Sequence, residues 1–193
     1  MKEKYRKKWM SLLLIAVLSI TQLLSVTTYA ADISDLASES RLPIVLTLGA
    51  DLSEDQKNQI LQYFGIEVSR VTAITITNQD EKEKLGNLIS AEQIGSRTVS
   101  CALVNPTNAG GIQVKTANMN YVTSNMIAGQ LSTSGVYNCE VLTAAPFEVS
   151  GTGALTGVMM AYEEASGVKL EEGKKELANV ELITTGNVAD TVG

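Results

Sequence analysis

Histidine is absent from the 193 residues of this chain. Ser-His-Asp triads, Cys-His nucleophile pairs, histidine general bases and zinc sites with histidine ligands are therefore excluded. Aromatic residues are also scarce, because the one tryptophan is Trp9 and only six tyrosines and phenylalanines follow residue 30. Six are too few for the stacking surfaces that nucleic-acid binders commonly use. Most familiar hydrolases thus lie outside the range of expected functions.

Long apolar runs are missing after the first thirty residues, which have the layout of a bacterial export signal. Five basic residues precede a mostly apolar run from Leu12 to Val26, and Thr28 and Ala30 supply the small residues of a cleavage site. We expect residues 1–30 to be a signal peptide cleaved near Ala30–Ala31, and the mature protein to be secreted or held in the cell envelope. An uncleaved anchor is the alternative, but the run is short and interrupted by polar residues. No membrane span is expected after signal removal.

Positive charge is scarce in the rest of the chain. Five of the 15 basic residues and one of the 21 acidic residues precede residue 31, which leaves 10 basic and 20 acidic side chains and a net charge of −10. This charge repels phosphate backbones and anionic lipid headgroups, so we expect no nucleic-acid partner. Residues 31–41 are polar and are interpreted as a loose leader. Residues 42–193 are expected to form a single globular domain, which is long enough to bury a core.

Hydrophobic periodicity predicts alternating strands and helices in this domain. The expected strands are residues 42–48, 71–77, 97–104, 112–116 and 136–143. The expected helices are residues 53–64, a helix that begins at Asn78, and residues 122–132, 152–165 and 171–183. Turn residues at 105–111 predict a hairpin between the third and fourth strands. The order is β-α-β-α-β-β-α-β-α-α, which indicates an α/β fold (α+β is the alternative) with a five-stranded mixed sheet covered by about five helices.

Two of these helices have recognisable starts. Ser53 and Gln56 have the spacing of a capping box, and Gly65 is placed to end that helix. Asn78 is predicted to cap the second helix, with Glu81 at the reciprocal position. Right-handed crossovers would make at least the first two strands parallel.

Cysteine occurs only at Cys101 and Cys139, both in predicted strands on an apolar face. Outside the cell such a pair can form a disulfide, which would close a loop of about 39 residues and stabilise the fold by roughly 4 kcal/mol. The alternative is two buried thiols that pack as small apolar side chains. The disulfide is the slightly less favoured reading, because nothing in the sequence shows whether the two strands are neighbours.

Three loops of the predicted fold are expected to meet at the carboxyl edge of the sheet, where open α/β sheets commonly bind ligands. The last of them is rich in glycine and opens a helix, a place where an anion can be held. We therefore consider as ligand-binding candidates Asp51, Asn78, Asp80, Ser150, Gly151, Thr152 and Gly153. Helix capping and close packing explain the same residues without a ligand, and this interpretation is preferred. Arg97 is a further candidate, but a lone arginine at the start of a strand is more often an exposed charge. No catalytic residue, metal site or cofactor is expected.

Several segments resemble the YpuA-like family of exported bacterial proteins, which is catalogued as a domain of unknown function. The matching segments are Val45–Leu52, Ile76–Glu81, Ile94–Arg97, Ala144–Phe147, Val149–Gly157 and Glu181–Gly186. The resemblance implies export and a domain that extends from about Leu42 to the end of the chain. Because members commonly continue with further helices, it also raises a chain truncated at its C-terminus as an alternative to a complete one. It implies no activity, catalytic residue or cofactor.

These observations lead us to expect a non-enzymatic protein that binds an envelope component or a wall polymer. The alternative is a carboxylate-dependent hydrolase of cell-wall glycan, for which Asp51 and Asp80 are the only pair of acids that we can propose. A third reading is an accessory protein that binds a metal ion through carboxylates alone. Export, acidity and the missing histidine favour the first.

Overall fold

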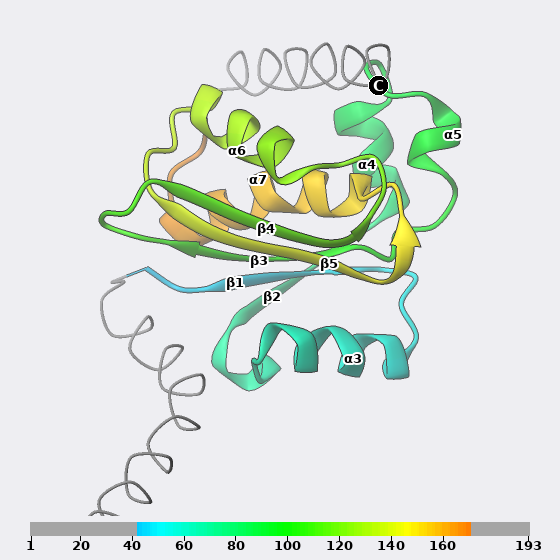
Figure 1. Cartoon of the computed structure of the whole chain (residues 1–193), viewed down its shortest axis with the longest axis horizontal. Coiled ribbons are helices and arrows are strands. Elements are labelled where there is room, and N and C mark those ends of the chain that lie inside the picture. Colours follow the sequence, from blue (N-terminus) through cyan, green and yellow to red (C-terminus); the bar gives the residue numbers. More distant parts are fainter. Residues whose placement is uncertain (1–41, 171–193) are drawn as a thin grey trace, which may run out of the picture. The chain divides into compact units, whose positions relative to one another are not determined.

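The computed structural model describes residues 42–170, which form a five-stranded sheet with helices on both faces (Figure 1). The strands are β1 (Val45–Gly49), β2 (Thr72–Ile76), β3 (Cys101–Pro106), β4 (Ile112–Met119) and β5 (Cys139–Val149). The helices are α3 (Glu54–Phe64), α4 (Asn78–Leu85), α5 (Ala91–Ile94), α6 (Ser124–Thr133) and α7 (Thr152–Ser166), with a short 3-10 helix at Val68–Arg70. The α/β fold class and the five-stranded mixed sheet are confirmed. Residues 1–41 and the helix expected at 171–183 lie outside the described residues.

The strands follow the spatial order β2-β1-β3-β5-β4. β1 is parallel to β2, and β4 is parallel to β5, whereas β3 is antiparallel to both of its neighbours. The parallel arrangement of the first two strands is therefore confirmed, with α3 as the crossover between them. None of the helices between residues 42 and 170 combines the length and the hydropathy that crossing a bilayer requires.

The predicted hairpin between β3 and β4 is wrong, because β5 is inserted between these two strands. The burial of each strand explains the arrangement. Side chains from Val141 to Ala145 are mostly buried, as in the interior of a sheet, whereas β4 alternates between half-buried and exposed residues, as an edge strand does. The amide of Cys139 donates to the Gly111 carbonyl at 3.0 Å, which fixes the register of β5 against the turn.

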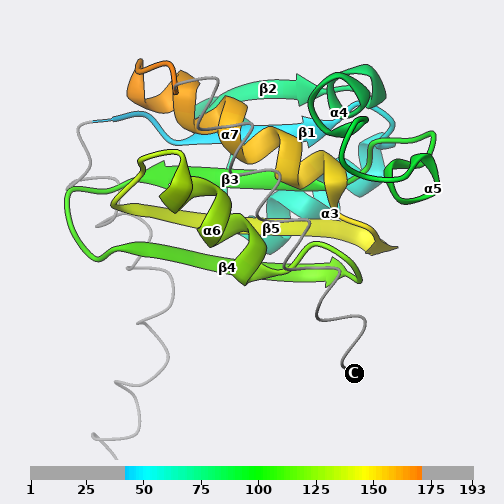
Figure 2. The same cartoon turned by 90° about the horizontal axis from the view of Figure 1, so that it is seen from above.

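Two separate apolar clusters fill the two faces of the sheet. The larger one lies under α4, α6 and α7 and includes Val104, Ile127, Val141, Leu155 and Val158. The smaller one lies under α3 and includes Leu46, Ile60, Phe64, Val99 and Leu103. Figure 2 shows α7 crossing the sheet over β1 and β3, with α6 beside it over β4. β1 is buried on both faces as its apolar run predicts.

Helix α7 approaches the sheet closely because a glycine faces β1. A Cβ on Gly157 would lie 2.6 Å from Thr47 Oγ1, well inside van der Waals contact. Thr47 is itself fully buried, and its hydroxyl accepts a hydrogen bond from the Ala102 amide at 2.9 Å. The small residues of this helix therefore serve packing against the sheet, as one of our two interpretations expected.

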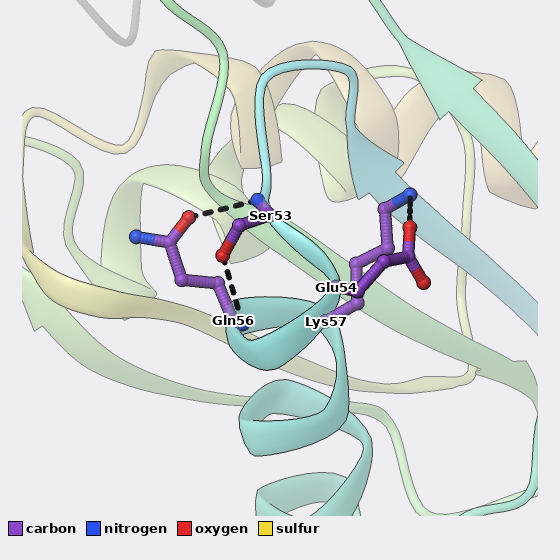
Figure 3. Close-up of polar contacts among 4 residues, drawn as sticks. All are labelled: Ser53, Glu54, Gln56 and Lys57. Carbon is purple, nitrogen blue, oxygen red and sulfur yellow. Dashed lines mark hydrogen bonds and ion pairs between the residues drawn. The ribbon is translucent and has the colours of Figure 1, made fainter.

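The capping box of α3 is confirmed (Figure 3). The Ser53 amide donates to Gln56 Oε1 at 3.0 Å, and the Gln56 amide donates to Ser53 Oγ at 3.3 Å. In the next turn Lys57 pairs with Glu54 at 2.7 Å. The two hydrogen bonds of the capping box satisfy amides that the start of a helix leaves without intrahelical partners.

The cap predicted for α4 is wrong by one residue. Thr77 is the cap, and its reciprocal partner is Asp80, because β2 ends one residue earlier than the sequence pattern suggested. Asn78 is the first residue of the helix instead. Moving the cap by one position turns Glu81 away from the helix end and into the protein interior, where it is buried.

The two cysteines are free thiols in separate parts of the interior, so the structure does not join them. Cys101 belongs to the cluster under α3, and Cys139 to the cluster on the opposite face of the sheet. In the β3–β5 ladder Cys101 pairs with Ala144, five residues along from Cys139. At about 3.3 Å per residue, the two Cα atoms are roughly 17 Å apart, whereas a disulfide needs less than about 7 Å.

Candidate functional site

The carboxyl ends of four strands, β1, β2, β4 and β5, lie at one edge of the sheet, and β4 is among them because it is parallel to β5. β1 and β2 are parallel, and β5 runs in the same direction because both it and β1 are antiparallel to β3. The loops after Gly49, Ile76 and Val149 are therefore neighbours, as the sequence predicted. The segment just before β3 reaches the same edge and supplies Thr98 and Ser100, which sequence reasoning did not include.

Asp51 holds the loop after β1 against the segment that leads into β3. Its amide donates to the Thr98 carbonyl at 3.0 Å, and its Oδ2 accepts from the Thr98 amide at 2.7 Å. Arg97 donates through Nη2 to the Asp51 carbonyl at 3.1 Å. The Asp51 carboxylate thus has a structural partner that fixes the geometry of this edge.

Asp80 is committed to the start of α4. Its Oδ2 accepts from the Thr77 amide at 2.8 Å and from the Thr77 hydroxyl at 2.6 Å. These hydrogen bonds hold the pKa of Asp80 below its ordinary value of 3.8, and nearby Lys84 adds a smaller contribution. Asn78 donates through Nδ2 to the Gly95 carbonyl at 3.2 Å, which ties α4 to the end of α5.

Glu81 lies beneath these loops, although no pattern in the sequence marked it as an interior residue. Its side chain is 1% exposed, and Oε1 accepts a hydrogen bond from the Thr98 hydroxyl. Oε2 has no hydrogen-bond partner among the described residues. Burial raises the pKa of Glu81, and the charges of Asp51 and Asp80 raise it further, while the hydroxyls of Thr152 and Thr98 oppose the shift.

The glycine-rich start of α7 is packed shut. Gly151, Thr152 and Gly153 are all buried, and a Cβ on Gly153 would lie 2.7 Å from Thr98 Cγ2. The Ala154 amide already donates to Ser100 Oγ at 2.8 Å. The position of the missing Cβ of Gly153 is also 3.3 Å from Glu81 Oε1, so a carboxyl of the protein lies where an external anion would have to sit.

Ser150, at the start of this loop, lines an open cavity. A cleft of about 570 Å³ lies between the α5 segment, the β4–α6 connection and the end of β5. Its lining combines aromatic, amide, hydroxyl and charged side chains, among them Glu92, Gln93, Arg97, Asn120, Tyr121, Phe147 and Ser150. Phe147 is 46% exposed, so part of its ring is open to contact in the cleft.

The cleft has the composition of a binding site. Its guanidinium can pair with an anion, its aromatic rings can contact apolar groups, and its amides can hydrogen-bond to polar ones. Sequence reasoning considered Arg97 but missed Tyr121 and Phe147, because isolated aromatic residues carry no signal that places them together. Within residues 42–170, no group of three or more acidic or cysteine side chains gathers closely enough to ligate a metal ion.

Comparison with known proteins places the chain in a family. The family model described as "Protein of unknown function (DUF1002)" matches residues 48–193. The uncharacterized protein YpuA of Bacillus subtilis (strain 168) is 39% identical over 189 residues, which cover 97% of this chain. The chain spans 62% of the length of that relative. No solved structure matches the chain significantly. The chain therefore belongs to the DUF1002 family of proteins of unknown function, as the resemblance of its motifs indicated.

Proposed function

We propose that this chain belongs to an exported, non-enzymatic protein that binds a wall polymer or another component of the cell envelope. The N-terminal segment supports export, because its cationic head, apolar run and small residues have the order of a cleavable signal. The net charge of −10 after residue 30 disfavours nucleic acid and anionic lipid as partners. The same charge does not disfavour binding to a polymer of sugars and short peptides.

The cleft beside the sheet edge is the observation that carries the proposal. Its volume of about 570 Å³ suits a small ligand or one repeating unit of a polymer. Tyr121 and Phe147 offer apolar contact area, while Asn120 and Gln93 offer both donors and acceptors. This mixture favours recognition of a polar ligand that also has apolar faces.

A glycan hydrolase is the less favoured alternative. Such an enzyme needs two carboxyl groups that are free to act on one bond. Asp51 accepts the Thr98 amide and Asp80 accepts the Thr77 amide and hydroxyl, so both acids of the proposed pair have structural duties. Neither of them lines the cleft.

Sedimentation with purified cell walls tests the binding proposal. The full protein should pellet with isolated walls, and a Phe147→Ala variant should remain largely in the supernatant because the cleft loses its exposed aromatic contact. Tyr63→Ala is a matched control, since Tyr63 is also exposed but lies on α3, away from the cleft. Equal pelleting of the protein and the Phe147→Ala variant would contradict recognition through the cleft. Release of soluble sugars from the walls would favour the hydrolase.

Cell fractionation tests export separately. The protein should be found in the envelope or the medium with an N-terminus at or near Ala31, as measured by mass spectrometry. Recovery in the cytosol with residues 1–30 still attached would overturn this part of the proposal.

A further inference from the structure

Arg97 is the only cation among the residues that line the cleft. Its contact with the Asp51 carbonyl orients the guanidinium without neutralising it. The ion pairs found in residues 42–170, Lys57–Glu54 and Arg70–Glu67, do not include it. A guanidinium carries five N–H donors in a planar fork whose geometry matches a carboxylate. Most donors of Arg97 therefore remain available to a bound ligand.

Glu92 brings an opposite charge to the same cleft. It is an exposed residue of α5 and forms no ion pair with Arg97 or with any other described residue. A purely anionic ligand would be repelled by Glu92, whereas a ligand with an additional amino group can match both charges. Charges in a cleft select among ligands because each ligand charge that faces a like charge of the protein weakens binding.

The other lining residues favour a ligand with amide groups and small apolar groups. Asn120 and Gln93 can each donate to a carbonyl and accept from an amide N–H. Val149, Tyr121 and Phe147 supply an apolar wall. A short peptide has this combination of backbone amides and apolar side chains, and a simple sugar acid lacks the amino group.

We propose that the cleft binds a short peptide with a free carboxylate and a free amino group, Arg97 pairing with the carboxylate and Glu92 with the amine. This inference rests on the proposed function and names the ligand class of that site. The peptides of a bacterial wall are one source of such ends. A sugar acid shares only the carboxylate, so it is treated as an outcome of the test.

Isothermal titration with the full protein and a set of matched ligands tests the proposal. The reference ligand is the tripeptide L-Lys-D-Ala-D-Ala, compared with its C-terminal amide and with its doubly N-acetylated form. Binding to the reference should be at least about tenfold tighter than to either modified peptide, because each modification removes one charge-assisted hydrogen bond. N-acetylmuramic acid and N-acetylglucosamine, which differ by a carboxylate-bearing group, form the sugar arm.

Two charge-neutralising variants assign the roles of the side chains. Arg97→Gln should weaken binding of the reference tripeptide at least about tenfold and leave the already weak binding of the amide unchanged. Glu92→Gln, which removes the partner of the free amine, should also weaken binding of the reference tripeptide at least about tenfold. It should leave the already weak binding of the N-acetylated peptide unchanged. Arg70→Gln and Glu67→Gln are the matched controls. Both residues are exposed and lie outside the cleft, and their substitutions change the net charge by the same amounts as Arg97→Gln and Glu92→Gln.

The outcomes separate this inference from the proposed function. The peptide assignment would be overturned if the protein bound the tripeptide and its amide equally well, or if the Arg97→Gln variant bound the tripeptide as well as the unchanged protein does. Either result would leave the proposed function standing if the protein still pellets with walls through Phe147. Tight, Arg97-dependent binding of N-acetylmuramic acid alone would replace the peptide with a sugar acid. Failure to pellet with walls, together with failure to bind any of these ligands, would remove both proposals.

Discussion

The Thr98 hydroxyl donates a hydrogen bond to Glu81 Oε1 at a point where both side chains are 1% exposed. Glu81 belongs to α4, and Thr98 lies just before β3, so one hydrogen bond joins two segments 17 residues apart. The position of the missing Cβ of Gly153, in the first turn of α7, lies 3.3 Å from the same Glu81 Oε1. A single buried acid thereby joins α4 to the segment before β3 and lies against the start of α7.

Replacing Glu81 by alanine should lower the free energy of unfolding by about 2–3 kcal/mol. The substitution opens a cavity and leaves the Thr98 hydroxyl without its buried acceptor. Urea unfolding followed by circular dichroism measures this change. Glu83→Ala on the exposed side of the same helix is the control and should change stability by less than about 0.5 kcal/mol. Similar effects of the two substitutions would mean that the buried carboxyl contributes little.

The raised pKa of Glu81 should make stability fall as pH rises. The unfolded chain releases the Glu81 proton near the ordinary pKa of 4.5, whereas the folded protein retains it up to its raised pKa. In this window the folded state binds more protons, so the free energy of unfolding decreases with increasing pH and levels off above the raised pKa. Glu81→Gln cannot ionise and should lack this decrease. Parallel curves for the two proteins, from urea unfolding at a series of pH values, would contradict the assignment.

Asp80 should have the opposite effect at more acidic pH. Because its capping hydrogen bonds lower its pKa below 3.8, its contribution to stability is present above that value and is lost as pH falls through the folded-state pKa. Asp80→Asn should therefore reduce the loss of stability below pH 3.8. An unchanged acid limb of the unfolding curve would show that the cap is not coupled to this ionisation.

Gly153→Ala should destabilise the fold by about 1–3 kcal/mol. The new Cβ would lie 2.7 Å from Thr98 Cγ2 and 2.9 Å from Ser100 Oγ, where the surrounding side chains are buried. Gly129→Ala in α6 is the matched control, because nothing lies within 4 Å of its Cβ position and alanine favours a helix, so it should stabilise by about 0.5–1 kcal/mol. Thermal unfolding of both variants measures the difference. A stabilising Gly153→Ala would show that α7 can move away from β3.

The sequence predicted the fold where local rules decide it. β1 was recognisable from its continuous apolar run, and the start of α3 from the spacing of Ser53 and Gln56. The position of β5 between β3 and β4 depends on contacts between residues far apart in the chain, and the local turn at 105–111 therefore suggested a hairpin that does not form. The choice between Thr77 and Asn78 as cap was similarly undetermined, since both residue types are good caps.

The site was predicted only in part for a related reason. The topology rule brought the loops after β1, β2 and β5 to one edge, but it could not show whether that edge is open. Gly153 has the small size that allows both ligand approach and tight packing, and only the position of Thr98 shows that packing applies. The cleft itself depends on Tyr121 and Phe147, whose proximity arises from the pairing of β4 with β5.

Cys101 and Cys139 should remain unreactive thiols in the folded protein. Burial raises the pKa of Cys101 to about 11 and that of Cys139 to about 12, so very little reactive thiolate forms near neutral pH. Ellman's reagent should therefore label neither residue in the native protein and both in denaturant. The intact mass should correspond to two reduced cysteines even after exposure to air, because the thiols lie on opposite faces of the sheet. A mass lower by two hydrogen atoms, with no labelling in denaturant, would reveal a disulfide and require a different pairing of β3 with β5.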